Sequence, residues 1–482
     1  SVDYFGFFIG IFSTPAVTHA ERACMIMARL GNHGRTAMQS DLQRNAEELA
    51  SLLTRVMPEK HREWRLRPAP TNQIPSMPKL AELAESLAKE SAKRIDAVAT
   101  RKKANLLIIR NLIRCLFEHC WLVLPTNWNN FTYGDYLKQL GLTKRVMQDA
   151  IEVLTGHPSE NRQNDANRKQ QGRYMHLGNV GLRVGNEVRL ASQFRATEEL
   201  VHLFCGLLYE DQGGWDEEHY EIPLGCSPEE LQHHKNQAKV LQEYNVFIRQ
   251  HSFALKGPMT RSFAEYPDRG GRITNAFQNL AQRRVPIRQQ TLINGEPIAE
   301  PDFSANHLRM AAFLCDVELP DDPYSAIVEH VEGATRDMVK KAVTACIGAL
   351  DPAQFGGMKS NFHKRVQGGS GERFEAIRDA LYQEYPFTQD VFFRDVGAHL
   401  QYLEGEVALK MMSWAMAMGV PLLPVHDSFA VPKPWAEETE RAMQMCWKVV
   451  MRDARASGDL ISKAGARAPA MYELSKAKRR KH

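Results

Sequence analysis

The sequence predicts an α+β fold, with a mostly helical N-terminal part and short strands placed among helices further along the chain. Residues 80–87 and 106–113 carry apolar side chains at the spacing of a helix. Residues 174–177 and 187–190 are short strand-like segments separated by glycines, which indicates a hairpin. Residues 420–432 contain two further apolar strands around a polar turn, so helices and short strands are both expected.

Length and composition place the chain among ordinary globular proteins. Its 482 residues suffice for roughly two to four domains. No apolar run reaches about 18 residues, so we expect no membrane-spanning helix. The apolar segment 5–12 lacks a preceding basic region, which disfavours a signal peptide. The eight cysteines form no CxxC pair, which disfavours a zinc site and predicts reduced cysteines in a cytoplasmic protein.

Positive charge is clustered although the net charge is only +4. Basic residues gather at 101–103, at 283–284 and in the tail 476–482. Such clusters suit a polyanion, because each neutralised phosphate releases counterions. The alternative is solvated surface charge that binds nothing.

The pattern divides the first half of the chain into a helical region, 1–103, and a second unit, 104–200. In the second unit a helix at 106–113 precedes a helix at 133–140 and a third that begins after Thr143, a favourable N-cap. The hairpin follows, and this order is typical of a winged helix.

Two basic residues, Lys144 and Arg145, follow that N-cap directly. We expect them to lie near a DNA backbone if the unit binds DNA as winged helices do. The alternative is a packing module that touches no nucleic acid. Residues 201–256 are expected to form a helical, thumb-like connector.

Asp302 stands at the end of a predicted strand. The segment 292–298 reads as a strand broken by a turn, and a helix is expected just beyond Asp302. A carboxylate at this position can project into a cleft. The alternative is that Asp302 is the N-cap of that helix.

Arg336 and Lys340 are four residues apart and therefore share a helix face. Two cations on one face repel each other unless they meet an anion. A nucleoside triphosphate is such an anion, because Arg can fork its oxygens and Lys acts as a point charge. The alternative is an exposed face that Asp337 relieves.

The turn His426-Asp427-Ser428 lies between the two apolar strands of 420–432. Polar side chains in such apolar surroundings are costly unless they have partners. The alternative is a simple turn in which Asp427 and Ser428 make local backbone bonds.

These segments together resemble the family A polymerases, which include bacterial DNA polymerase I and the single-subunit phage and mitochondrial RNA polymerases. The resemblance covers residues 257–435 and has the order of motifs found in that family. It is carried by Gly271-Arg272-Ile273-Thr274-Asn275 with Asn279-Leu280 and Val285-Pro286, by Asp302-Phe303-Ser304-Ala305-Asn306-His307-Leu308-Arg309, by Arg336 with Lys340, by the run 399–406, and by Val425-His426-Asp427-Ser428.

The resemblance implies a right-hand polymerase palm with helical fingers at 257–440, followed by a C-terminal helix and basic tail at 441–482. Asp302 and Asp427 would be the catalytic residues and, with the backbone carbonyl of Phe303, would hold two Mg²⁺ ions, with Mn²⁺ as an alternative. It places the remaining residues at the substrates: Arg336, Lys340, His307 and Thr344 at the incoming nucleotide, and Arg272, Gln401 and His426 at the primer terminus or the minor groove.

The expected function is therefore template-dependent nucleotidyl transfer by a DNA polymerase of a phage or mobile element, without proofreading. Its partners would be a DNA template, a primer and nucleoside triphosphates, and no membrane. His307 and Ser428 replace the two glutamates of the DNA enzymes, and Thr344 replaces the aromatic residue of the fingers helix. An RNA polymerase or primase-like enzyme of the same fold therefore stays open. So does a non-enzymatic, winged-helix replication initiator or regulator.

Overall fold

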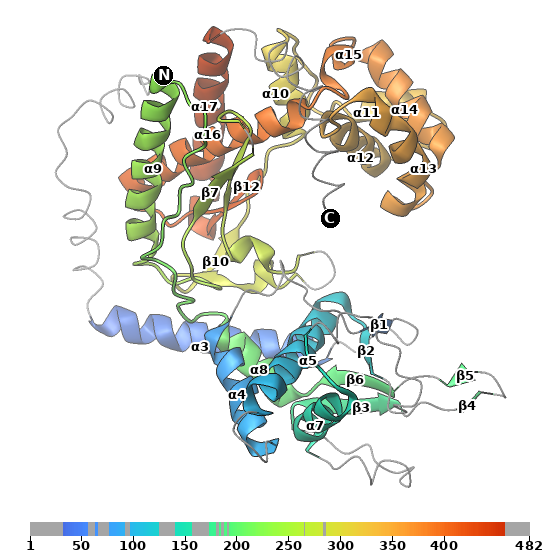
Figure 1. Ribbon diagram of the computed structural model, residues 1–482. Coiled ribbons are helices and arrows are strands. Elements are labelled where there is room, and N and C mark those ends of the chain that lie inside the picture. The colour runs from blue at the N-terminus through green and yellow to red at the C-terminus, as the bar shows by residue number, and fades with distance from the viewer. Residues whose placement is uncertain are drawn as a thin grey trace.

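The structure is a computed structural model that combines helices with several small sheets, which confirms the α+β prediction in this coarse sense. Figure 1 shows an N-terminal unit, coloured blue to green, beside a larger C-terminal unit, coloured green to red. The description covers residues 32–55, 63–65, 77–91, 97–124, 140–156, 173–179, 183–184, 188–189, 192–264, 266–282 and 286–457.

The N-terminal unit packs helices against one four-stranded sheet of order β1-β2-β6-β3, in which β1 and β2 are parallel and the other pairs are antiparallel. Its elements are α3 (Asn32–Arg55), β1 (Glu63–Arg65), α4 (Pro78–Ser91), α5 (Val98–Glu118), β2 (Trp121–Leu124), α7 (Lys144–Thr155), β3 (Met175–Asn179), β4 (Arg183–Val184), β5 (Val188–Arg189), β6 (Ser192–Ala196) and α8 (Glu198–Leu207).

The start of α7 confirms the predicted N-cap. The Thr143 hydroxyl accepts a hydrogen bond from the Val146 amide at 3.4 Å, which satisfies one of the free donors at the helix start. The apolar stripe of α4 is also confirmed, because Leu80, Ala84 and Leu87 are buried. The helix expected at 133–140 lies almost wholly outside the described residues.

The hairpin predicted between 174–177 and 187–190 is wrong. β3 pairs with β6, so Leu177 lies opposite Phe194, and β5 pairs instead with the two residues of β4. The distant partner β6 buries Phe194 and Ala196 in the core, which accounts for its pairing with β3.

The predicted boundaries at 103/104 and 200/201 fall inside α5 and α8. α5 continues across position 103 because its buried face, including Ile108 and Leu112, packs along α4 and α7. Helices α4 and α5 thus belong to one body, and the unit runs from α3 to α8.

The C-terminal unit contains a four-stranded sheet of order β11-β12-β10-β9 and a two-stranded one, β7-β8, surrounded by helices. Its elements are α9 (Pro228–Ile248), β7 (Thr260–Phe263), β8 (Gly270–Thr274), η4 (Phe277–Asn279), η5 (Arg288–Gln290), β9 (Leu292–Ile293), β10 (Glu296–Ala299), α10 (Asn306–Leu314), α11 (Ser325–His330), α12 (Arg336–Ile347), η6 (Pro352–Gln354), α13 (Phe355–Arg365), α14 (Gly371–Glu384), α15 (Thr388–Val391), α16 (Val396–Met418), β11 (Leu423–Val425), β12 (Ser428–Pro432), η7 (Lys433–Trp435) and α17 (Ala436–Ala456).

Two predicted turns are confirmed in this unit. β9 and β10 form a hairpin around Asn294 and Gly295, both at positive φ as a two-residue primed turn requires. β11 and β12 pair antiparallel around His426 and Asp427, with Val425 opposite Ser428. β10 then pairs with β12, which joins the two hairpins into one sheet.

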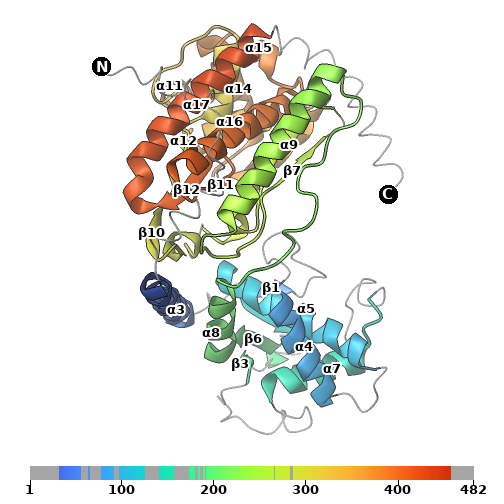
Figure 2. The same ribbon diagram turned by 90° about the vertical axis from the view of Figure 1, so that its left-hand side faces the viewer.

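Helix α16 is the central support of the C-terminal unit. It packs against α9, α17 and β8, and Figure 2 shows α9, α16 and α17 side by side. Gly405 lies where α16 crosses β8: a Cβ added there would be only 2.0 Å from the carbonyl oxygen of Gly271. The two backbones therefore touch, which only glycine permits.

Helices α11 to α15 form a group to one side of this sheet in Figure 1. They lie between α10 and α16 in the chain. Helix α17 follows β12, packs on α16 and extends across the boundary expected at 440. The last helix is therefore part of this unit's core rather than a separate tail element.

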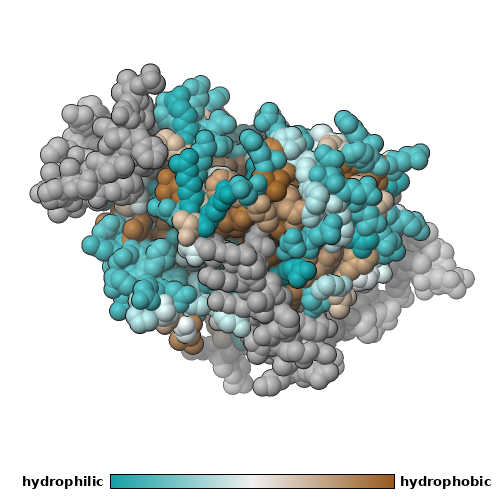
Figure 3. All heavy atoms as spheres, turned by 90° about the horizontal axis from the view of Figure 1, so that it is seen from above, coloured by the Kyte–Doolittle hydropathy of each residue, from teal (hydrophilic) through white to brown (hydrophobic). Residues whose placement is uncertain are grey.

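The surface seen from above is largely hydrophilic, with a band of hydrophobic residues between the charged ones (Figure 3). Within the described ranges, no helix is both long enough and apolar enough to cross a bilayer.

Candidate functional site

Asp302 and Asp427 lie on neighbouring backbones, although 125 positions separate them in the sequence. Asp302 forms an isolated antiparallel bridge with Ser428, and the Phe303 amide donates to the carbonyl oxygen of Asp427 at 3.3 Å. The Phe429 amide donates to Pro301 at 3.1 Å on the other side of the bridge. The structure thus brings together the three predicted metal ligands, Asp302, Phe303 and Asp427.

The alternative role of Asp302 as a helix N-cap is excluded. α10 begins at Asn306, and its N-cap position is Ala305, in the left-handed region at φ 53° with no side-chain cap. The Asp302 side chain is thus available for another role.

The two aspartates carry charge that the surrounding protein does not neutralise. Asp302 keeps solvent access, but desolvation by the protein packed around it and the negative charge of Asp427 raise its pKa to about 6. Burial and the nearby Glu404 raise the pKa of Asp427 above its usual value. Two neighbouring carboxylates with raised pKa values form a place where a cation would be stabilised.

Lys340 of α12 faces this pair. Its positive charge opposes the rise in the pKa of Asp302, so the ammonium lies within electrostatic reach of that carboxylate. Arg336, one turn earlier, forms an ion pair with Asp322 at 2.8 Å and lies over the Tyr324 ring at 5.2 Å. Asp337, which the alternative interpretation would pair with this face, bonds Lys341 instead.

Glu404 of α16 is a buried carboxylate that the sequence reasoning missed. Its side chain is only 4% exposed and forms ion pairs with Arg272 of β8 and, at 3.0 Å, with His307 of α10. The side-chain amide of Asn306 donates to it at 3.1 Å. Arg272 and His307, predicted to face different substrates, thus share one anchor.

Burial disfavours the charged form of Glu404, but His307 and Arg272 outweigh this effect and lower its pKa to about 2. The carboxylate therefore stays ionised. In the sequence, the feature that could have identified Glu404 is its position in the run 399–406, one helical turn after Gln401. Gln401 itself is partly buried on α16.

Glu300 is a second acidic residue that was not predicted. Arg288 donates two hydrogen bonds to its carboxylate, at 2.8 Å and 3.0 Å. Ser428 Oγ lies 2.9 Å both from Oε1 of Glu300 and from the carbonyl oxygen of Val425. Ser428 therefore makes the local bond expected of a turn and also joins Glu300 to the strand after Asp427. In the sequence, the feature that could have identified Glu300 is its position two residues before Asp302, because residues two apart on a strand point to the same face.

Two other predicted site residues border this region. His426 keeps solvent access and occupies the left-handed region at φ 56°. Desolvation by the protein packed around its ring, together with the charge of Arg272, lowers its pKa. Thr344 is exposed on α12, and its hydroxyl donates to the carbonyl oxygen of Lys340 at 2.8 Å. Thr344 therefore lies one turn beyond Lys340, as the sequence implied.

Lys144 and Arg145 lie on α7 in the N-terminal unit, so they are not part of this site. Arg145 pairs with Asp149 at 3.0 Å, and Asp149 also pairs with Arg101. Lys102 pairs with Glu85 at 2.7 Å. Much of the predicted basic cluster is thus neutralised within the protein. The clusters at 283–284 and 476–482 lie outside the described residues.

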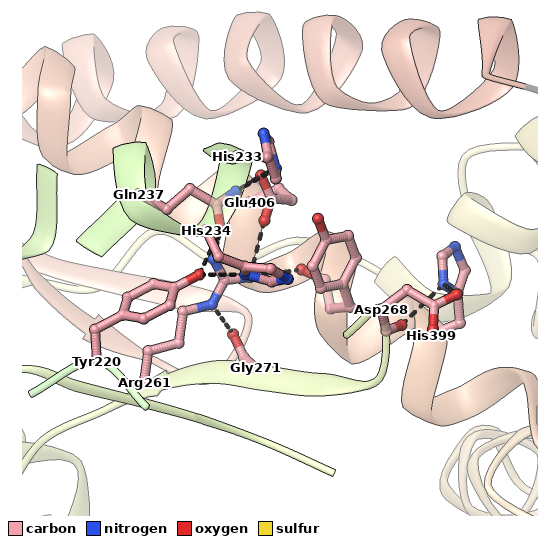
Figure 4. A network of polar contacts seen from close by, with 10 residues as sticks. Tyr220, His233, His234, Gln237, Arg261, Asp268, Gly271, His399 and Glu406 are labelled. Carbon is pink, nitrogen blue, oxygen red and sulfur yellow. Dashed lines mark hydrogen bonds and ion pairs between the residues drawn. The ribbon is translucent and has the colours of Figure 1, made fainter. Parts of the chain in front are cut away.

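A closed polar network holds β7 and β8 on α16 through Glu406, two residues after Glu404 (Figure 4). The fully buried Arg261 donates to the carbonyl oxygen of Gly271 at 2.6 Å and pairs with Glu406 at 2.9 Å. Gln237 accepts from Arg261 at 2.9 Å and also donates to Glu406. This network fixes the strand that carries Arg272.

The donors present fit divalent magnesium or manganese. Hard cations of this kind prefer carboxylate and carbonyl oxygens, and they usually take only one or two protein carboxylates. Asp302, Asp427 and the Phe303 carbonyl supply such a set. No group of three or more His, Cys, Asp or Glu side chains within the described ranges has the arrangement of a metal site. A metal held by Asp302, Asp427 and the Phe303 carbonyl would take its other oxygens from substrate and water.

No protein-family model matches this chain, and no curated protein is significantly similar to it in sequence.

Proposed function

We propose that the chain is a template-dependent nucleotidyltransferase, and specifically a polymerase that extends a primer on DNA with a palm-like site at Asp302 and Asp427. The observation that carries the proposal is the pairing of these two carboxylates on adjacent backbones, both with raised pKa values. Two carboxylates this close repel each other unless a cation lies between them, which favours a catalytic over a merely structural role.

In the proposed reaction the 3′-hydroxyl oxygen of the primer attacks the α-phosphorus of a nucleoside triphosphate. A new phosphodiester bond forms, the bond to pyrophosphate breaks, and the hydroxyl proton is lost to solvent. When bound, two Mg²⁺ ions would supply activation of the hydroxyl and neutralisation of the triphosphate charge. Asp302, Asp427 and the carbonyl of Phe303 would hold them.

The residues of α12 are proposed to bind the triphosphate. Lys340 already lies within electrostatic reach of Asp302, so a phosphate bound beside that carboxylate would lie near the ammonium. Arg336 would exchange its exposed partner Asp322, with a side chain 36% exposed, for phosphate oxygens. The exchange is feasible because exposed ion pairs contribute at most about 1 kcal/mol.

Arg272, His307, His426 and Gln401 are proposed to contact the nucleic acid or the sugar of the nucleotide. Arg272 and His307 are fixed by Glu404, and His426 is exposed beside Asp427. Thr344 is proposed to lie at the nucleotide, next to Lys340.

An RNA-synthesising or primase-like enzyme is the second candidate. It is favoured by His307 and Ser428, which replace the two glutamates of the DNA enzymes. Ser428 bonds Glu300 and supplies no carboxylate itself. A hydrogen-bonding imidazole paired with Glu404 is compatible with a ribose hydroxyl.

The test is primer extension on a DNA template with Mg²⁺, comparing deoxyribonucleotides with ribonucleotides. Asp427→Asn and Asp302→Asn should each lose at least about a thousandfold in rate, since each removes several kcal/mol of charge stabilisation. Glu440→Gln, an exposed substitution on α17, should leave the rate unchanged. Absence of incorporation by the parent chain, with DNA binding retained, would instead support the non-enzymatic initiator or regulator.

A further inference from the structure

Glu404 is held by three donors from two other segments of the chain. Nε of Arg272 bonds Oε2, while Nε2 of His307 and Nδ2 of Asn306 lie 3.0 Å and 3.1 Å from Oε1. The indole N–H of Trp447 donates to Oδ1 of Asn306 at 3.0 Å, which turns the amide NH₂ toward Glu404. The carboxylate is therefore fixed in position as well as ionised.

The two basic partners of Glu404, Arg272 and His307, also act electrostatically on a second carboxylate. His307 and Arg272 both lower the pKa of Asp427, and Arg272 also acts on the adjacent His426. Nη2 of Arg272 lies 3.3 Å from His307 Nε2, so the two groups form one compact basic pair beside Glu404. The strand that carries Arg272, β8, packs against β11, which ends just before the turn with Asp427, and Asn275 donates to the Pro424 carbonyl oxygen of β11 at 2.7 Å.

The side chain of Arg272 is one-third exposed and that of His307 one-fifth exposed, so neither is immobilised by complete burial. What keeps the pair on the α16 side is thus the buried negative charge of Glu404.

We propose that Glu404 is a positioning residue that holds Arg272 and His307 away from Asp427 and so keeps the Asp302–Asp427 pair free to bind divalent metal. The inference rests on the proposed function only in taking these aspartates as the metal site. Without the negative charge at position 404, the guanidinium of Arg272 would be a partly buried cation without a counter-charge. Asp427 is the nearest replacement, and a guanidinium paired with it would compete with the metal.

The test measures binding of Mn²⁺ alone, by electron paramagnetic resonance of the free ion, to the full chain without nucleotide or DNA. Four proteins are compared: the parent, Glu404→Gln, Arg272→Gln and the double variant. Glu404→Gln should weaken Mn²⁺ binding about 10- to 100-fold, the range seen when an outer-shell partner of a metal ligand is removed. The double variant should recover at least most of that loss, because the competing cation is gone.

Recovery in the double variant is the decisive result when circular dichroism shows that Glu404→Gln keeps the fold of the parent, since the second substitution then acts on the metal site rather than on folding. If Glu404→Gln binds Mn²⁺ as tightly as the parent, or if the double variant stays as weak as the single one, the inference is overturned. Glu440→Gln on α17 is the matched control for loss of one carboxylate and should bind like the parent.

Should Glu404→Gln not fold, Glu404→Asp carries the same test with the charge retained and the reach shortened. Its loss should be smaller and should again be recovered by Arg272→Gln. The outcomes separate this inference from the proposed function. A parent that binds Mn²⁺ and extends primers, with unaffected Glu404 variants, overturns only the inference. A parent that binds no Mn²⁺ overturns both.

Discussion

Glu404 and Glu406 are two residues apart on α16 and serve opposite sides of that helix. The Glu404 side chain is buried and that of Glu406 is 15% exposed, and neighbouring basic side chains outweigh desolvation and lower the pKa of each to about 2. Their surroundings differ. Glu406 meets Arg261, whose guanidinium is enclosed by the rings of Tyr220, Phe263 and Tyr402 at 4.9–5.7 Å.

The Glu406 side is closed. Arg261 has partners on Nε, Nη1 and Nη2, and Gln237, Tyr220 and His234 continue the network inward, as Figure 4 shows. On the Glu404 side the cations are part-exposed and the charge continues outward to Asp427 and Asp302. A buried ion pair thus indicates structure where its charges balance, and a site where an excess of one sign remains beside it.

The largest expected effects lie on the open side. Asp302→Asn and Asp427→Asn should abolish primer extension, with a loss of at least about a thousandfold, while leaving the fold intact. The reason is that each removes a metal-holding charge and relieves repulsion. Circular dichroism checks that the fold is intact, and the extension rate measured on the same samples checks the loss of activity. Unfolding of either variant would show that these aspartates hold the structure together.

On the closed side the expected effect is on stability. Arg261→Met leaves Glu406 buried without its cation and should cost about 3–5 kcal/mol of unfolding free energy. Arg272→Met, on a one-third exposed side chain, should cost clearly less. Urea denaturation of the two variants measures the difference. Equal losses would remove the distinction between the closed and the open side.

Position 405, where α16 crosses β8, should tolerate no side chain. Gly405→Ala places a Cβ 2.0 Å from the Gly271 carbonyl oxygen, so a backbone must shift, at a cost of about 1–3 kcal/mol. Gly206→Ala in α8 is the matched control, because its Cβ would meet nothing within 4 Å. That variant should be stabilised by up to about 1 kcal/mol. Thermal unfolding of both reports the sign, and a neutral Gly405→Ala would contradict the contact.

The smallest expected effect is a pH dependence on the open side. The pKa of Asp302 is about 6 in the folded protein and near 3.8 in the unfolded chain, so the folded state binds the proton more tightly. Its contribution to stability is present below pH 3.8 and is lost as the pH rises through about 6. With EDTA present, Asp302→Asn should therefore gain stability over the parent at pH 7 and lose that advantage near pH 4.

Urea midpoints at the two pH values test this sign. Glu406→Gln should behave oppositely, because the folded-state pKa of Glu406 is lowered from 4.5 to about 2. Its deficit relative to the parent should be full at pH 7 and shrink as the pH falls below 4.5. A common sign in both variants would refute the difference between the two sides.

Features that depend on neighbouring residues were predictable from the sequence. The cap at Thr143, the turn at Asn294 and the strands on either side of His426 each follow from a few adjacent residues, and the structure contains all three. The order of the motifs also led to Asp302 and Asp427, which the fold brings side by side. Their catalytic role stays a prediction.

Features that depend on distant partners were not predictable. The partner of β3 is chosen by the core rather than by the glycines near it. Glu404 has its meaning only through residues 272, 306 and 307, which a single pass along the chain does not connect. The neutralisation of Arg101 and Arg145 by Asp149 depends in the same way on the packing of α5 against α7.

The bare backbone contact between Gly405 and Gly271 limits how this sequence can drift. Glu404 and Glu406 could each be exchanged if their cationic partners changed with them, since charge pairs can be rebuilt from other residues. No compensating change elsewhere makes room for a Cβ between two touching main chains without moving one of them. A distant relative could therefore lose both acids and still be identified by the small residue that stands between their positions.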